Sequence, residues 1–298
     1  MARARAGLEA PSRMTVAQAR PASRPMTLRE HFAQGTVEDS PDLQRILALP
    51  RRPKPELRDI VNQMTFRLKK PEGTQTLREH QAWMLWEAPR VGGMLGAIRT
   101  GGGKTLVSML MPMVFPPVTE PDGTTRPLRA VLFIPPSMRA QFAHDWEVYG
   151  KHWKLPNLAG GKWFTAGIPV LHVVAYSELS HAKSTALLRQ IKPDLIVADE
   201  CSNLRNPASS RAFRFLNHYV SAPETIFCGW DASIIATGIG DFWHLLGIAL
   251  GEGSPTPLSE AELRRWALAL DPSLREGYFM PGALLQFCEP GESPRSGF

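Results

Sequence analysis

The sequence has few of the residues from which disulfide-bonded or metal-binding domains are built. Only three cysteines occur in 298 residues, with no paired short spacing, so neither a disulfide framework nor a zinc site is indicated and we expect a reducing compartment. The eight histidines also lack metal-ligand spacing. No stretch approaches ~20 consecutive apolar residues, and the start lacks the apolar segment of a secretory signal. We therefore expect no membrane span, no membrane partner and no secretion.

The composition excludes several protein classes and leaves a soluble globular chain. Hydrophobic residues make up 43%, charged residues 21% and aromatic residues 8%, which excludes disorder, collagen and small disulfide scaffolds. At ~150 residues per domain, the length predicts two domains, or one α/β domain with extensions.

The positive charge is concentrated near the N-terminus. Of the net charge of +6, residues 1–25 carry +4, from five arginines and one glutamate, which leaves only +2 for the rest. Such a segment adds salt-dependent attraction to phosphate backbones, and we expect a disordered basic arm. The remaining charge balance gives no independent support for a binding face. For the basic clusters at 67–70 and 151–154, a DNA-facing role is one interpretation, and solvated loops are the favoured one.

Residues 26–73 are expected to form an N-terminal extension with short helices. Ser40 precedes a proline and apolar residues at helical spacing, which predicts a helix that ends before Pro50. From residue 74 to 250 helical segments alternate with short apolar runs, which is typical of a mostly parallel sheet with helices on both faces. Residues 251–298 are expected to form a C-terminal helical extension. The predicted strands cover 93–98, 130–134, 171–176, 195–199 and 225–229.

A glycine-rich loop is the strongest chemical signal. It follows an apolar run that ends at Ile98 and precedes the helical run 106–113, and its residues are Thr100, Gly101, Gly102, Gly103, Lys104 and Thr105. Glycines let backbone N–H groups close around phosphate oxygens, the lysine reaches the terminal phosphates, and the threonine hydroxyl can hold Mg²⁺. The segment therefore predicts a P-loop that binds ATP and Mg²⁺.

A second signal is the run from Asp194 to Glu200, a buried strand that ends in two carboxylates. Asp199 fits the role of holding Mg²⁺, and Glu200 fits the role of orienting and deprotonating the attacking water. An Asp-Glu pair alone often marks a helix start. About ninety residues after a P-loop it indicates a phosphate site.

Five segments in this order resemble the motifs of the first RecA-like domain of superfamily 2 helicases, with the Swi/Snf-type DNA translocases as the nearest branch. The resemblance covers about residues 74–250, and its most diagnostic piece is DECSNLRN, similar to D-E-A-H-x-L-K-N. The segments are TLREHQ, IRTGGGKT, VLFIPPSMRAQF, VVAYSEL and DLIVADECSNLRN.

The resemblance implies a role for each matching residue. Gln81 would read the adenine edge, Lys104 and Thr105 would bind phosphate and Mg²⁺, and Asp199 and Glu200 would be the catalytic acids. Contacts to the backbone of duplex DNA would come from Ser137, Arg139, Gln141, Tyr176 and Ser177. Such contacts position a strand without reading its sequence. For Tyr176, a partly buried aromatic at a strand end is an equal alternative.

Three features depart from the family. Cys201 and Ser202 replace a small residue and a histidine, and Asp231 to Ile234 replace a T-G-T-P turn. No second RecA-like lobe with an arginine finger follows residue 250, although such a group contributes ~10³ or more to related phosphoryl transfers. We therefore expect either one half of a motor, with the partner lobe encoded elsewhere, or a fragment of a longer motor.

Three hypotheses follow. The leading one is the ATP-binding lobe of a DNA-dependent ATPase, either a helicase or a translocase. The second is a non-catalytic regulatory module derived from a helicase, and the third is another P-loop motor such as a DNA-packaging ATPase. Frequent Arg, Ala, Gly and Pro indicate a GC-rich bacterial or phage genome, so we expect the cytoplasm of a bacterial or phage-infected cell.

Overall fold

The computed structural model describes residues 40–50, 56–181, 186–232 and 239–270. The expected basic arm, the whole of the segment 26–39 and part of the 231–234 turn lie outside these ranges. The chain divides into two compact units, one of residues 53–233 and one that combines 1–52 with 234–298. Each is described separately.

The larger unit is built on a six-stranded parallel sheet with the strand order β1-β8-β7-β4-β6-β5. The five predicted strands are all present, and β5 is an edge strand that the sequence pattern did not indicate. Apart from the sheet, β2 (Val118–Thr119) and β3 (Thr125–Arg126) form a small antiparallel pair. The sheet strands are β1 (Met94–Ala97), β4 (Arg129–Ile134), β5 (Asn157–Leu158), β6 (Val170–Ala175), β7 (Leu195–Asp199) and β8 (Ile226–Asp231).

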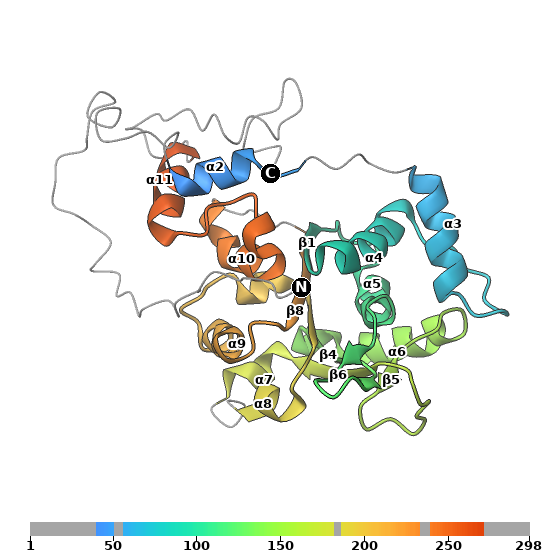
Figure 1. Ribbon diagram of the computed structural model, residues 1–298. Helices are drawn as coiled ribbons and strands as arrows, with labels where there is room; N and C mark the ends of the chain where they lie inside the picture. The colour runs from blue at the N-terminus through green and yellow to red at the C-terminus, as the bar shows by residue number, and fades with distance from the viewer. Residues whose placement is uncertain (1–39, 51–55, 182–185, 233–238, 271–298) are drawn as a thin grey trace, which may run out of the picture. The chain divides into compact units, whose positions relative to one another are not determined.

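Helices pack on both faces of this sheet (Figure 1). On one face Leu132, Val197 and Trp230 join the core formed with α3 to α6. On the other face the ring of Phe215 packs against Phe133 and Phe227. The first group is α3 (Leu57–Leu68), α4 (Glu79–Val91), α5 (Lys104–Leu110) and α6 (Arg139–Gly150), and the remaining helices of the unit are α7 (Tyr176–Ser180), α8 (Leu187–Ile191) and α9 (Ser210–Ser221).

The predicted α/β fold class, with a mostly parallel central sheet and helices on both faces, is confirmed. Its lower boundary differs from the expected residue 74. Ile60, Met64 and Leu68 of α3 are buried in the same core as Leu85 and Trp153. Because α3 contributes to this core, it is part of the sheet unit and not a separate extension.

The smaller unit joins two segments that lie about 200 residues apart. Its helices are α2 (Pro41–Leu47), α10 (Trp243–Leu250) and α11 (Glu260–Leu270). Ser40 caps α2 as expected, since its side chain accepts a hydrogen bond from Leu43 N. Arg45 donates to the carbonyls of Glu252, Ser254 and Thr256 at 2.8, 2.6 and 2.7 Å.

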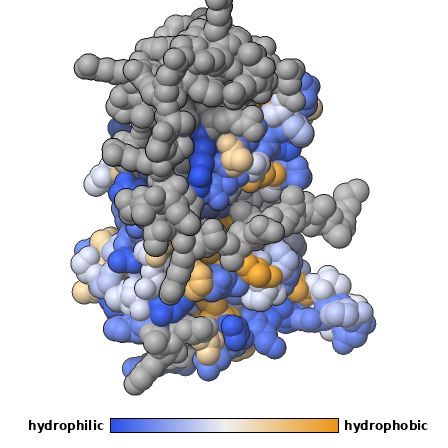
Figure 2. All heavy atoms as spheres, turned by 90° about the vertical axis from the view of Figure 1, so that its left-hand side faces the viewer, coloured by the Kyte–Doolittle hydropathy of each residue, from blue (hydrophilic) through white to orange (hydrophobic). Residues whose placement is uncertain are grey.

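No helix in the described part of the chain is long and apolar enough to cross a membrane. On the face that Figure 2 shows, hydrophobic residues form small patches between hydrophilic ones.

Candidate nucleotide site

The P-loop turns from β1 into α5 in a conformation that needs its glycines. Gly101 and Gly103 have φ angles of 76° and 80°, a region that residues with a Cβ rarely adopt. A Cβ on Gly102 would lie 2.5 Å from Ile98 Cγ2 and 2.9 Å from Arg99 O. The loop therefore brings backbone N–H groups to the start of α5, where Lys104 is the first helical residue.

The N-terminus of α4 supports this loop. His80 Nε2 lies 2.8 Å from Gly102 O, and Gln81 Nε2 donates to the same oxygen at 3.0 Å. Arg78 Nη1 donates to Gly101 O at 2.8 Å, and its backbone N–H donates to Gln81 Oε1 at 2.9 Å. Gln81 is only 4% exposed. It would have to exchange these bonds to read an adenine edge, so here it holds the P-loop, and adenine recognition stays a prediction.

The two predicted acids lie next to the P-loop lysine. In the sheet β8 separates β1 from β7, yet Lys104 Nζ, from the helix after β1, donates to Glu200 Oε1. Glu200 has φ 55° and ψ 58°, a left-handed conformation that costs a non-glycine residue roughly 1 kcal/mol or more. Such strain is concentrated at functional sites, and here it holds the carboxylate beside the lysine.

Asp199 is the buried acid of the site. It is 4% exposed, and burial, followed by repulsion from Glu200, raises its pKa to about 7. Its Oδ1 is buried without a hydrogen-bond partner among the described residues. An unpaired buried carboxylate oxygen is costly, and it is the ligand that Mg²⁺ prefers. The donor set of Asp199 and the Thr105 hydroxyl therefore fits Mg²⁺ held jointly with nucleotide phosphates.

Asp231 is a residue of this site that the sequence reasoning treated only as a departure from the family turn. Its Oδ2 accepts a hydrogen bond from Ser202 N at 2.9 Å, and its carbonyl accepts one from Ile98 N at 2.8 Å. Asp231 is buried at the end of β8 and thus joins the strand before the P-loop to the turn after Glu200. Its position at the carboxyl end of a predicted buried strand was the available signal.

Four of the five predicted DNA contacts lie at the same edge of the sheet. Ser137 and Arg139 follow β4, and Ser177 follows β6, the neighbouring strand; all three are exposed. Arg139 forms an ion pair with Glu178, which joins the two segments. Gln141, also exposed, donates to Asp145 at 2.7 Å.

Tyr176 requires a correction. Its side chain is fully buried, and its hydroxyl donates to Asp199 O at 2.9 Å. The ring also stacks on Phe133 in the core. A buried side chain cannot contact a nucleic acid directly. Tyr176 instead supports the end of β7 through its hydrogen bond to Asp199 O, so its role is structural.

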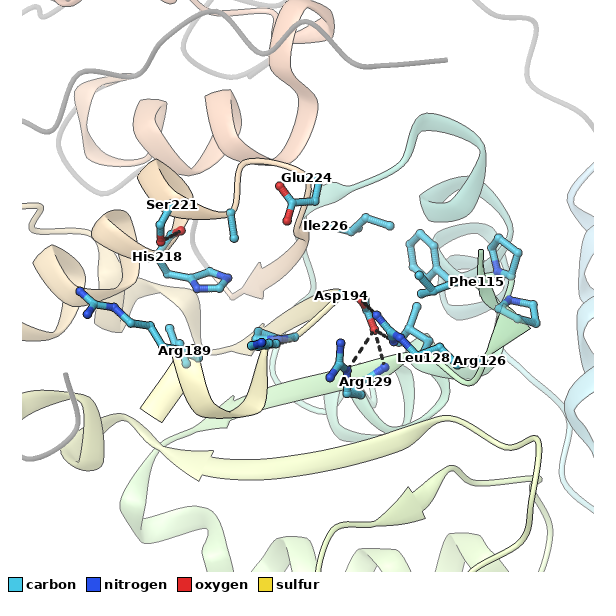
Figure 3. Close-up of a pocket in the computed structure, with 17 residues that line it drawn as sticks. Phe115, Arg126, Leu128, Arg129, Arg189, Asp194, His218, Ser221, Glu224 and Ile226 are labelled. Carbon is cyan, nitrogen blue, oxygen red and sulfur yellow. Dashed lines mark hydrogen bonds and ion pairs between the residues drawn. The ribbon is translucent and has the colours of Figure 1, made fainter. Parts of the chain in front are cut away.

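A separate cavity of about 610 Å³ lies at the opposite edge of the sheet. The first residues of β4 and β8 contribute to it, as do the C-terminal parts of α8 and α9. Figure 3 shows Arg126, Arg129 and Asp194 grouped beside it, and Arg126 forms hydrogen bonds of 2.6 and 2.8 Å with Asp194. No P-loop residue or catalytic acid lines this cavity, so it is distinct from the nucleotide site.

Comparisons with known proteins found limited similarity. No protein-family profile and no curated protein matches the chain. A crystal structure of the UvsW helicase from bacteriophage T4 aligns with a TM-score of 0.39 and 16% identity, covering 67% of this chain and 67% of that chain. A second T4 UvsW structure aligns with a TM-score of 0.39 and 15% identity. That alignment covers 60% of this chain and only 35% of the UvsW chain. Similarity at this level carries no function across, so the function rests on the site.

Proposed function

We propose that this chain is the ATP-binding lobe of a DNA-dependent ATPase of the helicase or translocase type. The observation that carries the proposal is the meeting of three groups at one edge of the sheet. A glycine loop presents Lys104, Glu200 contacts that lysine from a left-handed backbone conformation, and Asp199 keeps a buried oxygen without a partner among the described residues. A binding module without nucleotide chemistry needs none of these costly features.

Each side chain has a distinct part in the proposed reaction. When ATP binds, Lys104 leaves its ion pair with Glu200 and pairs with the terminal phosphates, because its ammonium group can bind either anion. The released Glu200 carboxylate is then free to accept a proton from the attacking water. Asp199 and Thr105 would hold Mg²⁺, which neutralises phosphate charge when bound. Asp231 keeps the acidic turn at a constant place relative to the P-loop.

The experiment is titration calorimetry of the whole chain with ATP in the presence and absence of Mg²⁺. We expect binding that requires Mg²⁺ and is lost in Lys104→Ala. Lys162→Ala is the matched control, because Lys162 is exposed in the loop after β5, the outer strand at the end of the sheet away from β1 and the P-loop. Equal ATP affinity for Lys104→Ala and the native chain would contradict the proposal.

The proposal also includes a dependence of ATP hydrolysis on DNA and on a second lobe. Four exposed residues after β4 and β6 are candidates for backbone contacts, and the active ATPase would need an arginine supplied by another lobe. We expect duplex DNA to stimulate hydrolysis only after a candidate lobe with that arginine is added. Full stimulation by a lobe whose arginine is replaced by alanine would contradict this part.

A further inference from the structure

The positive charge of the sheet unit is concentrated in two short segments. Residues 56–232 contain 20 Lys or Arg and 15 Asp or Glu, a net charge of +5. Segments 67–74 and 150–165 together contain six basic residues and one acid, which is also +5, so the remaining 14 basic and 14 acidic residues cancel. We call these six residues the basic patch: Arg67, Lys69, Lys70, Lys151, Lys154 and Lys162.

The fold joins these segments, which lie about 80 residues apart in the sequence. Lys70 N donates to His152 O at 2.9 Å, and Lys154 N donates to Leu68 O at 2.8 Å. The ammonium groups of Lys70 and Lys154 donate to backbone carbonyls of the other segment, Gly150 O and Arg67 O, at 2.5 and 2.9 Å. Two clusters that separately resemble solvated loops thus form one continuous surface.

This surface is rigid and lies away from the nucleotide site. Between the lysines of the second segment, Trp153 is fully buried and donates to Gln75 Oε1 at 2.8 Å. The segment after α6 enters β5 at Asn157, which pairs with Val170, the first residue of β6. Residues 151–156 therefore lead to the amino ends of the strands. The P-loop and the acids lie at the carboxyl ends.

Two exposed aromatic side chains lie in the loop that follows the second segment through β5, next to Lys162 in the sequence. The loop after β5 carries Trp163 and Phe164, which are 87% and 69% exposed, directly after Lys162. The buried Asn157 side chain holds the base of the loop, donating to Thr165 O and Ile168 O at 2.8 and 3.1 Å and accepting from Thr165 N at 2.8 Å. The loop therefore presents two aromatic rings to solvent on an ordered base.

We propose that the basic patch and this aromatic loop form a binding surface for single-stranded nucleic acid, separate from the predicted contacts at Ser137 and Arg139. Lysines that follow a phosphate backbone, combined with aromatic rings on which bases stack, are the two elements of sequence-independent single-strand binding. An acidic protein surface would match the charge but would leave the two rings without stacking partners. The surface does not depend on ATP binding.

The test is fluorescence anisotropy with fluorescein-labelled dT20 and U20 and the whole chain, without nucleotide, from 50 to 200 mM salt. We expect Lys151→Gln/Lys154→Gln/Lys162→Gln to bind about tenfold or more weakly and to reduce the salt slope by ~2, since each phosphate contact on a single strand contributes ~0.7. The charge-matched control, Arg58→Gln/Arg189→Gln/Arg205→Gln, changes exposed residues outside the patch and should retain the slope.

Stacking has its own readout. Trp163→Ala should weaken binding about fivefold or more and remove the quenching of tryptophan fluorescence by dT20, while Phe164→Ala should weaken binding and retain the quenching. Equal binding by the patch and control triple variants would overturn the proposal. Full displacement of dT20 by poly-L-glutamate at equal charge concentration would also overturn it, in favour of an acidic protein partner.

Discussion

At the scale of single residues, the candidate site concentrates unfavourable features that a purely structural region would avoid. Asp199 is buried beside a second carboxylate, and Glu200 has a left-handed backbone conformation. The Lys104 ammonium offsets part of this charge. Such groups stabilise a ligand at the expense of the free protein, so removing one of them should separate stability from function.

Asp199→Asn should raise the free energy of unfolding at pH 8 and leave it nearly unchanged near pH 4. The folded-state pKa of about 7 lies above the ordinary aspartate value of 3.8, so the penalty for ionising Asp199 develops as the pH rises from about 4 to about 7. A pKa shift of one unit corresponds to ~1.4 kcal/mol, so the gain in the free energy of unfolding should be at most a few kcal/mol. Thermal unfolding at both pH values measures the effect.

The same variant should lose Mg²⁺-dependent ATP binding. Glu120→Gln is a suitable comparison, since Glu120 pairs with Arg126 outside the nucleotide site. A gain in stability of equal size at pH 4 and pH 8 would contradict the assigned pKa.

At the scale of elements, the P-loop conformation comes from neighbours as much as from its glycines. The N-terminus of α4 binds two P-loop carbonyls, and Trp230 of β8 donates through Nε1 to Ser108 Oγ of α5 at 2.9 Å. Ser108 Oγ in turn donates to Lys104 O at 3.0 Å. These contacts place the lysine before any ligand arrives, which lowers the ordering cost of binding.

Gly102→Ala should weaken ATP binding about tenfold or more while the chain stays folded. The added Cβ would meet Ile98 and the carbonyl of Arg99, and such overpacking typically costs ~1–3 kcal/mol. Gly253→Ala is the control, because a Cβ there meets nothing within 4 Å. Calorimetry with ATP and circular dichroism together decide the result, and ATP affinity equal to that of the control would contradict the packing argument.

At the scale of the whole molecule, the chain contains two units whose folding need not be coupled. The smaller unit depends on contacts between α2 and the segment after α10. Asp42 accepts hydrogen bonds from Leu258 N at 3.1 Å and from Ser259 N at 3.0 Å, and Arg45 donates to three carbonyls of residues 252–256. The first described helix is therefore a structural part of the C-terminal segment.

Arg45→Ala should destabilise the smaller unit and leave the nucleotide site intact. Removing a charged donor costs ~1–3 kcal/mol for each carbonyl that is left buried and unpaired, and of the three acceptors Ser254 and Thr256 are in buried residues. Hydrogen exchange should become faster in residues 243–263 and remain unchanged in 94–134, with unchanged ATP affinity. The exposed Arg264, which pairs with Glu260 on α11, provides the control variant Arg264→Ala. Faster exchange in both regions would show that the two units unfold together.

The local pattern determined the elements that carry the chemistry. The spacing of apolar and glycine residues was enough to predict the five main strands, the helix capped by Ser40 and the P-loop, because these depend on neighbouring residues. The acids at the end of β7 were predictable for the same reason. Proximity in sequence decides such features before any long-range contact forms.

Only the tertiary structure decided which distant groups meet. Burial separates Tyr176 from the surface, and Asp231 reaches Ser202 through the order of the strands. The average charge concealed the basic patch, because the lysines of two segments become neighbours only when α3 and α6 end at one place. Arg45 likewise meets the segment after α10 only in the folded chain. Packing sets these contacts, and packing depends on side chains that lie far apart in the sequence.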